Sequence, residues 1–263
     1  MYTRFALSSL VVLFLASMFA GSAWGKAPTG AEREQELLRI WYEIREGVAA
    51  KGDPDAKYDV AVANFLAHGT SQDYSKAANW FRRAADRGHA GAHYYLGYMY
   101  AMGVGVESDK ESSATHYLRA AELGHPEAQY LIGSRYAAGE GFTRDRGEAL
   151  KWMTKAAEKG VPGAQFYLGQ VHELGYGVRP DTEAAVRWYK AAANQGEKSA
   201  QNRLGELYLA GQGVSRDSSE AYLWFSLAAN EEGIAAASRS LSRSQREAAD
   251  ERVREHNGLA MTR

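Results

Sequence analysis

Two histidines four residues apart are the first group in this protein whose spacing suits metal chemistry. His89 and His93 have the i, i+4 separation that places two imidazoles on one face of a helix, as in many zinc sites. His89, however, falls in a linker between predicted helices, no glutamate follows it as in the H-E-x-x-H pattern, and a third ligand is not evident. The sequence therefore favours structural histidines, and we expect neither a metal nor another cofactor.

Five aspartates recur at one spacing and suggest, at first sight, a ladder of metal-binding carboxylates. They are Asp73, Asp109, Asp145, Asp181 and Asp217. Each precedes a predicted helix, where a carboxylate accepts hydrogen bonds from free backbone N–H groups and stabilises the helix by about 1 kcal/mol. Glu148 and Glu220 follow two of them by three residues, the spacing of a capping box. We therefore predict helix capping as their role.

Sequence patterns typical of catalysis are missing. The sequence has no Gly-x-Ser-x-Gly or Ser-x-x-Lys pattern, so a hydrolytic nucleophile is not visible. Glycine pairs such as Gly139 and Gly141 lack the strand and the third glycine of a dinucleotide-binding loop. With 0 cysteines, disulfides, thiolate metal sites and cysteine nucleophiles are excluded. We expect a protein that is not an enzyme and has no catalytic residues.

A helical hairpin positions these residues and repeats every 36 residues. In residues 162–197, Ala164, Leu168 and Val171 form the apolar stripe of a first helix, and a second stripe runs from Ala185 to Ala193. The period is visible in Ala56, Ala92, Ala128, Ala164 and Ala200. Tryptophans recur in the second helices and are predicted to be buried between stacked repeats. They are Trp80, Trp152, Trp188 and Trp224, with His116 in the remaining place.

The period defines the expected domain organisation. Five repeats occupy residues 54–233, namely 54–89, 90–125, 126–161, 162–197 and 198–233. Residues 26–53 are predicted to form a lead and an N-terminal capping helix, 234–256 a single C-terminal capping helix, and 257–263 a flexible tail. An unbroken period of this length is typical of an array in which each unit buries its apolar face against its neighbours.

The repeated motif resembles the Sel1-like repeat family, which is related to the tetratricopeptide repeats. The shared pattern is A-x-x-x-L-G-x-x-Y-x-x-G-x-G-V-x-x-D-x-x-x-A-x-x-W-x-x-x-A-A-x-x-G, and it is seen with small departures in 92–124 and 200–229. The resemblance implies an all-α fold, a right-handed α-solenoid of stacked helix hairpins that serves as a scaffold or adaptor. Residues 67–70 and 231–233 depart from the pattern, as expected of terminal units.

The first 25 residues read as a secretory signal. Arg4 precedes an apolar run from Leu10 to Ala20, and Ala23-Trp24-Gly25 provides the small residues of a cleavage site before Lys26. The apolar run is shorter than the ~20 residues of a membrane span. We expect a periplasmic or secreted bacterial protein without stable membrane insertion after cleavage, although a retained N-terminal anchor is the alternative.

Charge and composition leave two function classes. The net charge of −1 argues against nucleic-acid binding, which depends on clustered positive charge. The first class is an interaction scaffold for a protein partner in envelope signalling, secretion or motility assembly. The second is a cell-wall-directed enzyme or binder of β-lactams or peptidoglycan, known from cysteine-rich members of the resembled family, and the lack of cysteine here weakens it.

A partner site is predicted on the first helices, which line the concave face in the resembled family. Positions two before and two after each buried leucine or isoleucine project to that face. The predicted partner-binding residues are Tyr58, Tyr94, Tyr98, Tyr130, Ser134, Phe166, Gln170, Asn202 and Glu206. Aromatic side chains supply much of the energy of peptide interfaces. The alternative for Tyr94, Tyr130 and Phe166 is that their rings pack between adjacent first helices.

Overall fold

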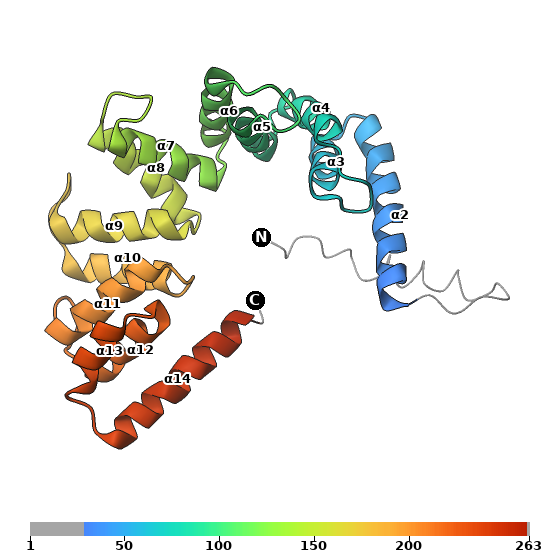
Figure 1. The fold of residues 1–263 in the computed structure, drawn as a ribbon. Coiled ribbons are helices and arrows are strands. Elements are labelled where there is room, and N and C mark those ends of the chain that lie inside the picture. Colours follow the sequence, from blue (N-terminus) through green and yellow to red (C-terminus); the bar gives the residue numbers. More distant parts are fainter. Residues whose placement is uncertain (1–28, 262–263) are drawn as a thin grey trace. The chain divides into compact units, whose positions relative to one another are not determined.

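Helices account for all regular secondary structure that the structure describes. The computed structural model describes residues 29–261, and side chains as far as His256. The predicted signal segment, the first residues of the N-terminal lead and the last two residues of the tail lie outside this range. Thirteen helices fill it (Figure 1). None of them combines the length and the hydropathy needed to cross a membrane.

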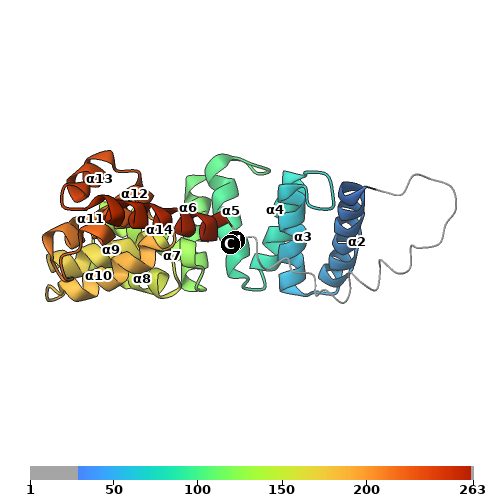
Figure 2. The same cartoon turned by 90° about the horizontal axis from the view of Figure 1, so that it is seen from below.

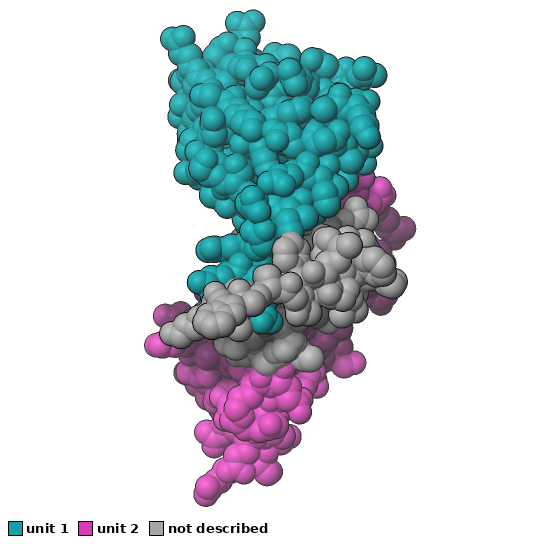
Figure 3. Space-filling model, turned by 90° about the vertical axis from the view of Figure 1, so that its right-hand side faces the viewer, with its two compact units in different colours: residues 1–116 teal, residues 117–263 magenta. Residues whose placement is uncertain are grey.

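The protein divides into two compact units, residues 1–116 and 117–263, which Figure 3 colours separately. The division falls inside α6 (Lys110–Glu122). The other helices of the first unit are α2 (Gly30–Ala50), α3 (Pro54–Leu66), α4 (Tyr74–Ala85) and α5 (Ala90–Met102). The second unit contains α7 (Pro126–Ala138), α8 (Arg146–Glu158), α9 (Pro162–Leu174), α10 (Thr182–Ala193), α11 (Lys198–Ala210), α12 (Ser218–Ala228), α13 (Glu231–Ser238) and α14 (Arg243–Met261).

Within each unit the helices pack in sequence order. In the first unit α3 lies between α2 and α4, and in the second unit α9, α10, α11 and α12 form a continuous series (Figures 1 and 2). Odd-numbered helices from α3 to α11 are the first helices of their repeats, and even-numbered ones from α4 to α12 are the second. Each unit is therefore a stack of helix hairpins, which confirms the predicted all-α solenoid class.

The periodic aspartates begin the second helices. Asp145 Oδ1 accepts hydrogen bonds from the backbone N–H groups of Gly147 at 2.8 Å and Glu148 at 3.0 Å. The other four aspartates cap their helices in the same way. The predicted capping role is confirmed. The return bond of a capping box is not formed, because Glu148 pairs with Lys151 and Glu220 pairs with Arg252.

Glycine ends most of the first helices. Gly103, Gly139, Gly175 and Gly211 close their helices in the left-handed conformation, which a residue without Cβ adopts at little cost. The first repeat departs from this pattern. Ala67 occupies the same place with φ of 61°, so the strain expected of a left-handed alanine lies in the terminal repeat.

Each second helix buries a bulky side chain directly after the tryptophan, or after His116 in the second repeat. Phe81, Tyr117, Met153, Tyr189 and Phe225 hold this place and are all buried. Trp80, Trp152 and Trp224 are buried as predicted, whereas Trp188 is only half-buried. The bulky residue fits against the glycine of the first helix in its own repeat: a Cβ on Gly133 would lie 3.0 Å from Met153 Cγ, and one on Gly205 would lie 2.6 Å from Phe225 Cε1. The glycine and the bulky residue together set how closely the two helices of a hairpin approach.

A buried glutamine joins each repeat of the second unit to the preceding one. Gln129, Gln165 and Gln201 donate from Nε2 to the carbonyl oxygens of Ala121, Ala157 and Ala193, at 3.0, 3.3 and 3.0 Å. These carbonyls belong to the last turn of the preceding second helix, and each also accepts a backbone N–H, from Gly124, Gly160 and Gly196 respectively. The glutamines therefore add a second hydrogen bond to each carbonyl and link successive hairpins.

The C-terminal segment differs from the prediction. Residues 234–256, expected to form one helix, belong to two helices, α13 and α14, separated at residues 239–242. Ser242 begins α14 with a reciprocal pair of hydrogen bonds to Gln245, at 2.9 and 3.3 Å. α14 packs along α12, where Tyr222 donates to Asp250 at 2.7 Å. The helix also continues to Met261, into the predicted tail.

Candidate partner-binding surface of the first helices

The nine residues predicted to contact a partner lie on α3, α5, α7, α9 and α11, and we call them the first-helix surface. Leu96, Ile132, Leu168 and Leu204, which separate them, are buried. Tyr98 and Tyr130 are 39% and 36% exposed, Glu206 is exposed, and the other six are half-buried. All nine thus keep some contact with solvent, while the residue between each pair faces the core. Their role in binding stays a prediction.

Aromatic rings dominate this surface in the first unit. Tyr58 stacks on His89, with ring centroids 4.2 Å apart, and a Cβ on Gly91 would lie 3.0 Å from Tyr58 Cε2. Tyr98 meets Phe65 edge-on at 6.1 Å. Tyr58 therefore packs over the start of the next first helix, whereas Tyr98 leaves more of its ring available.

Two aromatic side chains continue the surface in the second unit. Tyr130 lies against Gly163, where a Cβ would be 2.8 Å from the ring and the hydroxyl. Phe166 packs at 5.6 Å from the ring of Tyr189. The contacts of Tyr58 with Gly91 and of Tyr130 with Gly163 were not predicted. The sequence does contain an indication of these contacts, because a glycine follows Tyr58 and Tyr130 by the same number of residues. No glycine stands at that separation after Tyr94 or Phe166.

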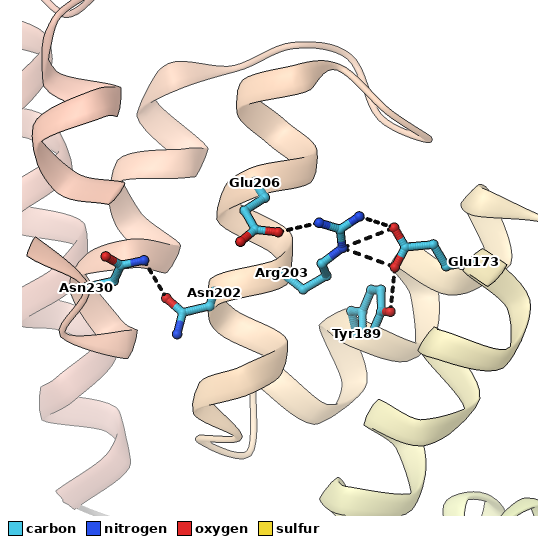
Figure 4. Close-up of polar contacts among 6 residues, drawn as sticks. All are labelled: Glu173, Tyr189, Asn202, Arg203, Glu206 and Asn230. Carbon is cyan, nitrogen blue, oxygen red and sulfur yellow. Dashed lines mark hydrogen bonds and ion pairs between the residues drawn. The ribbon is translucent and has the colours of Figure 1, made fainter. Parts of the chain in front are cut away.

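The C-terminal end of the first-helix surface is polar and internally bonded (Figure 4). Glu173 on α9 accepts a hydrogen bond from the hydroxyl of Tyr189 on α10 at 2.7 Å, and two from Arg203 Nε on α11 at 3.0 and 3.1 Å. Arg203 also forms an ion pair with Glu206. The predicted partner residue Glu206 is thus held by a cation that is itself anchored to the preceding repeat.

The charges in this cluster are mutually dependent. Burial alone would raise the pKa of Glu173, but hydrogen bonds from Arg203 and Tyr189 outweigh it and lower the pKa. Burial and the neighbouring Glu173 raise the pKa of Tyr189, so its hydroxyl remains a donor at neutral pH. The hydrogen bond to Glu173 also raises the pKa of Arg203. Glu173 therefore stays ionised between two donors.

Asn202 is also fixed from a neighbouring element. Its Oδ1 accepts from Asn230 Nδ2 at 3.0 Å, and Asn230 caps α13 by accepting from the backbone N–H of Gly233 at 3.0 Å (Figure 4). Asn202 and Glu206 are thus oriented before any partner arrives, and preorganised side chains lose less entropy on binding. Ser134 lies on α7 with Tyr130, and Gln170 lies on α9 with Phe166.

The two histidines singled out by spacing are used for packing. His89 caps α5, its Nδ1 accepting from the backbone N–H of Ala92 at 3.1 Å. His93 pairs with His116, with the two Nδ1 atoms 2.9 Å apart. Burial, together with His93 and Arg82, lowers the pKa of His116, which therefore favours the neutral ring. Among the described residues, no three His, Cys, Asp or Glu side chains come together in a way that suits a metal ion.

The repeats identify the family. The Sel1 repeat family matches residues 54–89, 90–125, 126–161, 162–197 and 198–232. The protein therefore belongs to the Sel1 repeat family, as its motif predicted. Sel1 repeat proteins are generally scaffolds for protein interactions, and this protein has the helical-repeat fold of that class.

Two solved structures illustrate the likeness. A Sel1 repeat protein from Oxalobacter formigenes is 28% identical, with a TM-score of 0.62 over 84% of this protein and 98% of that one. The protein c5321, described as a protective antigen present in uropathogenic Escherichia coli, is 27% identical, with a TM-score of 0.59 over 86% of this protein. The present sequence spans only 57% of the length of c5321. A comparison with curated protein sequences gave no match.

Proposed function

We propose that this protein is an exported scaffold that holds a segment of a protein partner on its first-helix surface, in an envelope signalling, secretion or motility assembly. The observation that carries the proposal is that the predicted partner residues combine partial exposure with fixed orientation. Tyr98 presents a large ring, and Asn202 and Glu206 are held by Asn230 and Arg203. The secretory pattern of residues 1–25 supports export.

Contact chemistry changes along the surface and suggests how a segment would lie. Within the second unit, the rings of Tyr130 and Phe166 suit apolar side chains, and the end formed by Asn202 and Glu206 suits hydrogen-bond donors and cations. A partner segment matching this order would carry apolar residues at one end and polar or basic ones at the other. No catalytic step is required of the protein in this role.

The test compares two triple variants in partner capture. Tyr98→Ala, Gln170→Ala and Glu206→Ala remove three side chains of the first-helix surface, whereas Thr115→Ala, Glu158→Ala and Arg187→Ala remove three exposed side chains of second helices. We expect the first variant to lose captured partners from a periplasmic extract and the second to retain them, with both melting close to the wild type.

Two results would contradict the proposal. Equal capture by both variants would show that the partner does not bind the first-helix surface. Turnover of nitrocefin or tight binding of muropeptides by the purified protein would favour the cell-wall alternative instead. Quantitative mass spectrometry of the captured material, with the binding-deficient variant as background, separates specific partners from adventitious ones.

A further inference from the structure

A cleft at the outer end of the repeats occurs twice, at matching positions. Each copy is a cavity of about 580 Å³ between a second helix and the interhelical loop of the next repeat, and each lies wholly within one unit. The shared lining is a cation, a tyrosine and the aspartate cap. These pairs, three repeats apart, are Arg82 and Lys190, Tyr100 and Tyr208, and Asp109 and Asp217. The volume lies within the ~300–1,000 Å³ typical of ligand sites.

The loop residues give the two copies different charges. In the first unit the loop carries Glu107 and Ser108, and Arg82 donates to the hydroxyl of Tyr100 at 3.4 Å. In the second unit the corresponding residues are Ser215 and Arg216. The second-unit cleft therefore brings two cations, Lys190 and Arg216, to one cavity, whereas the first-unit cleft has one, Arg82. Each cleft is lined by two acids, which are Glu107 and Asp109 in the first unit and Asp217 and Glu220 in the second.

Both acids of the second-unit cleft already have partners. Asp217 accepts from the backbone N–H groups of Ser219 and Glu220 at 2.8 and 3.1 Å, and Glu220 pairs with Arg252 on α14 at 2.5 Å. Lys190 lies over the ring of Tyr208, with Nζ 5.3 Å from the centroid. Within the described part of the protein, neither Lys190 nor Arg216 has a carboxylate partner. The cleft thus offers a ligand two cations that are not engaged by a carboxylate of the described residues.

The floor of the cleft is aromatic and contains an unsatisfied donor. Tyr208 and Trp224 are only 9% and 6% exposed, and Val214 covers them from the loop. Trp224 Nε1 is buried and finds no hydrogen-bond acceptor among the residues that the structure describes. An unsatisfied buried donor is costly, and it lies in a residue that lines the cleft. The rings also provide flat surfaces for the stem of a side chain.

We infer that the cleft between α10 and the 211–217 loop binds a carboxylate of an acidic peptide segment, supplied by the protein partner. This inference rests on the proposed scaffold function and adds a second contact outside the first-helix surface. Two cations that line the same cleft suit one carboxylate, whereas nucleic-acid binding depends on clustered positive charge, and the net charge of this protein is −1. The carboxylate belongs to an aspartate, to a glutamate or to the C-terminus of the partner.

Fluorescence anisotropy with labelled peptides tests the site on purified residues 26–263. The probe is a hexapeptide of alternating Asp and Glu with an amidated C-terminus. Its Asn/Gln counterpart is the neutral control, and that counterpart with a free C-terminus isolates the terminal carboxylate. We expect the acidic probe to bind and the amidated neutral one not to bind. Binding of the free-acid form alone would identify the terminal carboxylate as the ligand, which also supports the site.

Variants of the two clefts provide the matched comparison. Lys190→Gln with Arg216→Gln is expected to weaken binding by about tenfold or more, and Arg216→Glu, on an exposed loop, to do so without a change in melting temperature. Arg82→Gln in the first-unit cleft should leave affinity unchanged. Equal affinity of all variants, equal binding of the neutral peptide or no binding of any carboxylate probe would overturn the inference. Continued loss of partner capture in the first-helix variant would then show that the scaffold proposal still holds.

Discussion

The ring of Phe225 occupies the space that a side chain on Gly205 would need. A Cβ at Gly205 would lie 2.6 Å from Cε1 and 2.7 Å from Cδ1 of that ring, well inside van der Waals contact. Phe225 is itself buried between α11 and α12, so neither partner has room to move aside. The contact explains why a glycine stands in the middle of a helix, where it would otherwise be unfavourable.

Gly205→Ala should therefore lower the free energy of unfolding by about 1–3 kcal/mol, because overpacking forces the helices of the hairpin apart. Urea denaturation at constant pH measures the change. Gly47→Ala in α2 is the matched control, since a Cβ there meets nothing within 4 Å and should stabilise the helix slightly. A neutral effect of Gly205→Ala would show that the hairpin does not depend on this contact.

Ala67→Gly should raise stability by about 1 kcal/mol, because glycine removes the strain of a left-handed alanine at φ of 61°. Ala138→Gly, at the exposed last position of α7, is the control and should be slightly destabilising. Thermal unfolding followed by circular dichroism distinguishes the two. If Ala67→Gly also destabilises, flexibility gained by the unfolded state outweighs the strain relieved in the fold.

The Glu173 cluster makes stability depend on acid pH. The pKa of Glu173 in the fold lies below its ordinary value of 4.5, so its contribution is present above about pH 4.5 and is lost as pH falls through the folded value. Glu173→Gln should cost about 1.5–3 kcal/mol at pH 7, the range for hydrogen bonds to charged groups. The difference from the wild type should narrow below pH 4.5.

Urea titrations at several pH values check this dependence, and Glu158→Gln, at an exposed position of α8, serves as the control. A constant difference between wild type and Glu173→Gln from pH 7 to pH 3 would mean that Glu173 does not titrate as an ionised partner of Arg203.

Export predicts a defined mature N-terminus. A tagged protein expressed in a Gram-negative host should be recovered from the periplasm beginning at Lys26, as measured by intact mass. Gly25→Trp should block processing, because the residue before the cleavage site must be small, and the precursor should then stay with the membrane fraction. Recovery of the unprocessed wild-type protein in the inner membrane would support the anchor alternative.

Much of the fold could be read from the sequence because its determinants recur with the period. Asp145 and its counterparts cap helices, and Gly175 and its counterparts end them, and both act within a few residues of their own position. Residues with long-range partners were harder to assign. Trp188 and Tyr189 both fall on the apolar stripe predicted from Ala185 to Ala193, yet Tyr189 is fully buried and Trp188 only half-buried, because the packed hairpin decides which part of the stripe lies deepest.

The division of the C-terminal cap into α13 and α14 was indicated by local residues, although the apolar pattern continues across the break. Ser242 and Gln245 stand at the spacing of a capping box, although neither glycine nor proline marks the break. The polar end of the first-helix surface had no such signal. Arg203 meets Glu173, and Asn202 meets Asn230, at separations of 30 and 28 residues, so these partners become neighbours only when the repeats stack.

The buried glutamines make the array directional. The donors Gln129, Gln165 and Gln201 lie in the first helix of their repeat, and the acceptor carbonyls lie at the end of the preceding second helix. A duplicated repeat can therefore form the same hydrogen bond with the repeat before it and with the repeat after it. Such an array can lengthen by gene duplication without new side chains. At the equivalent turn α13 presents Ile234, which offers no amide, so copies inserted before residue 198 should be accepted more readily than copies appended after α13.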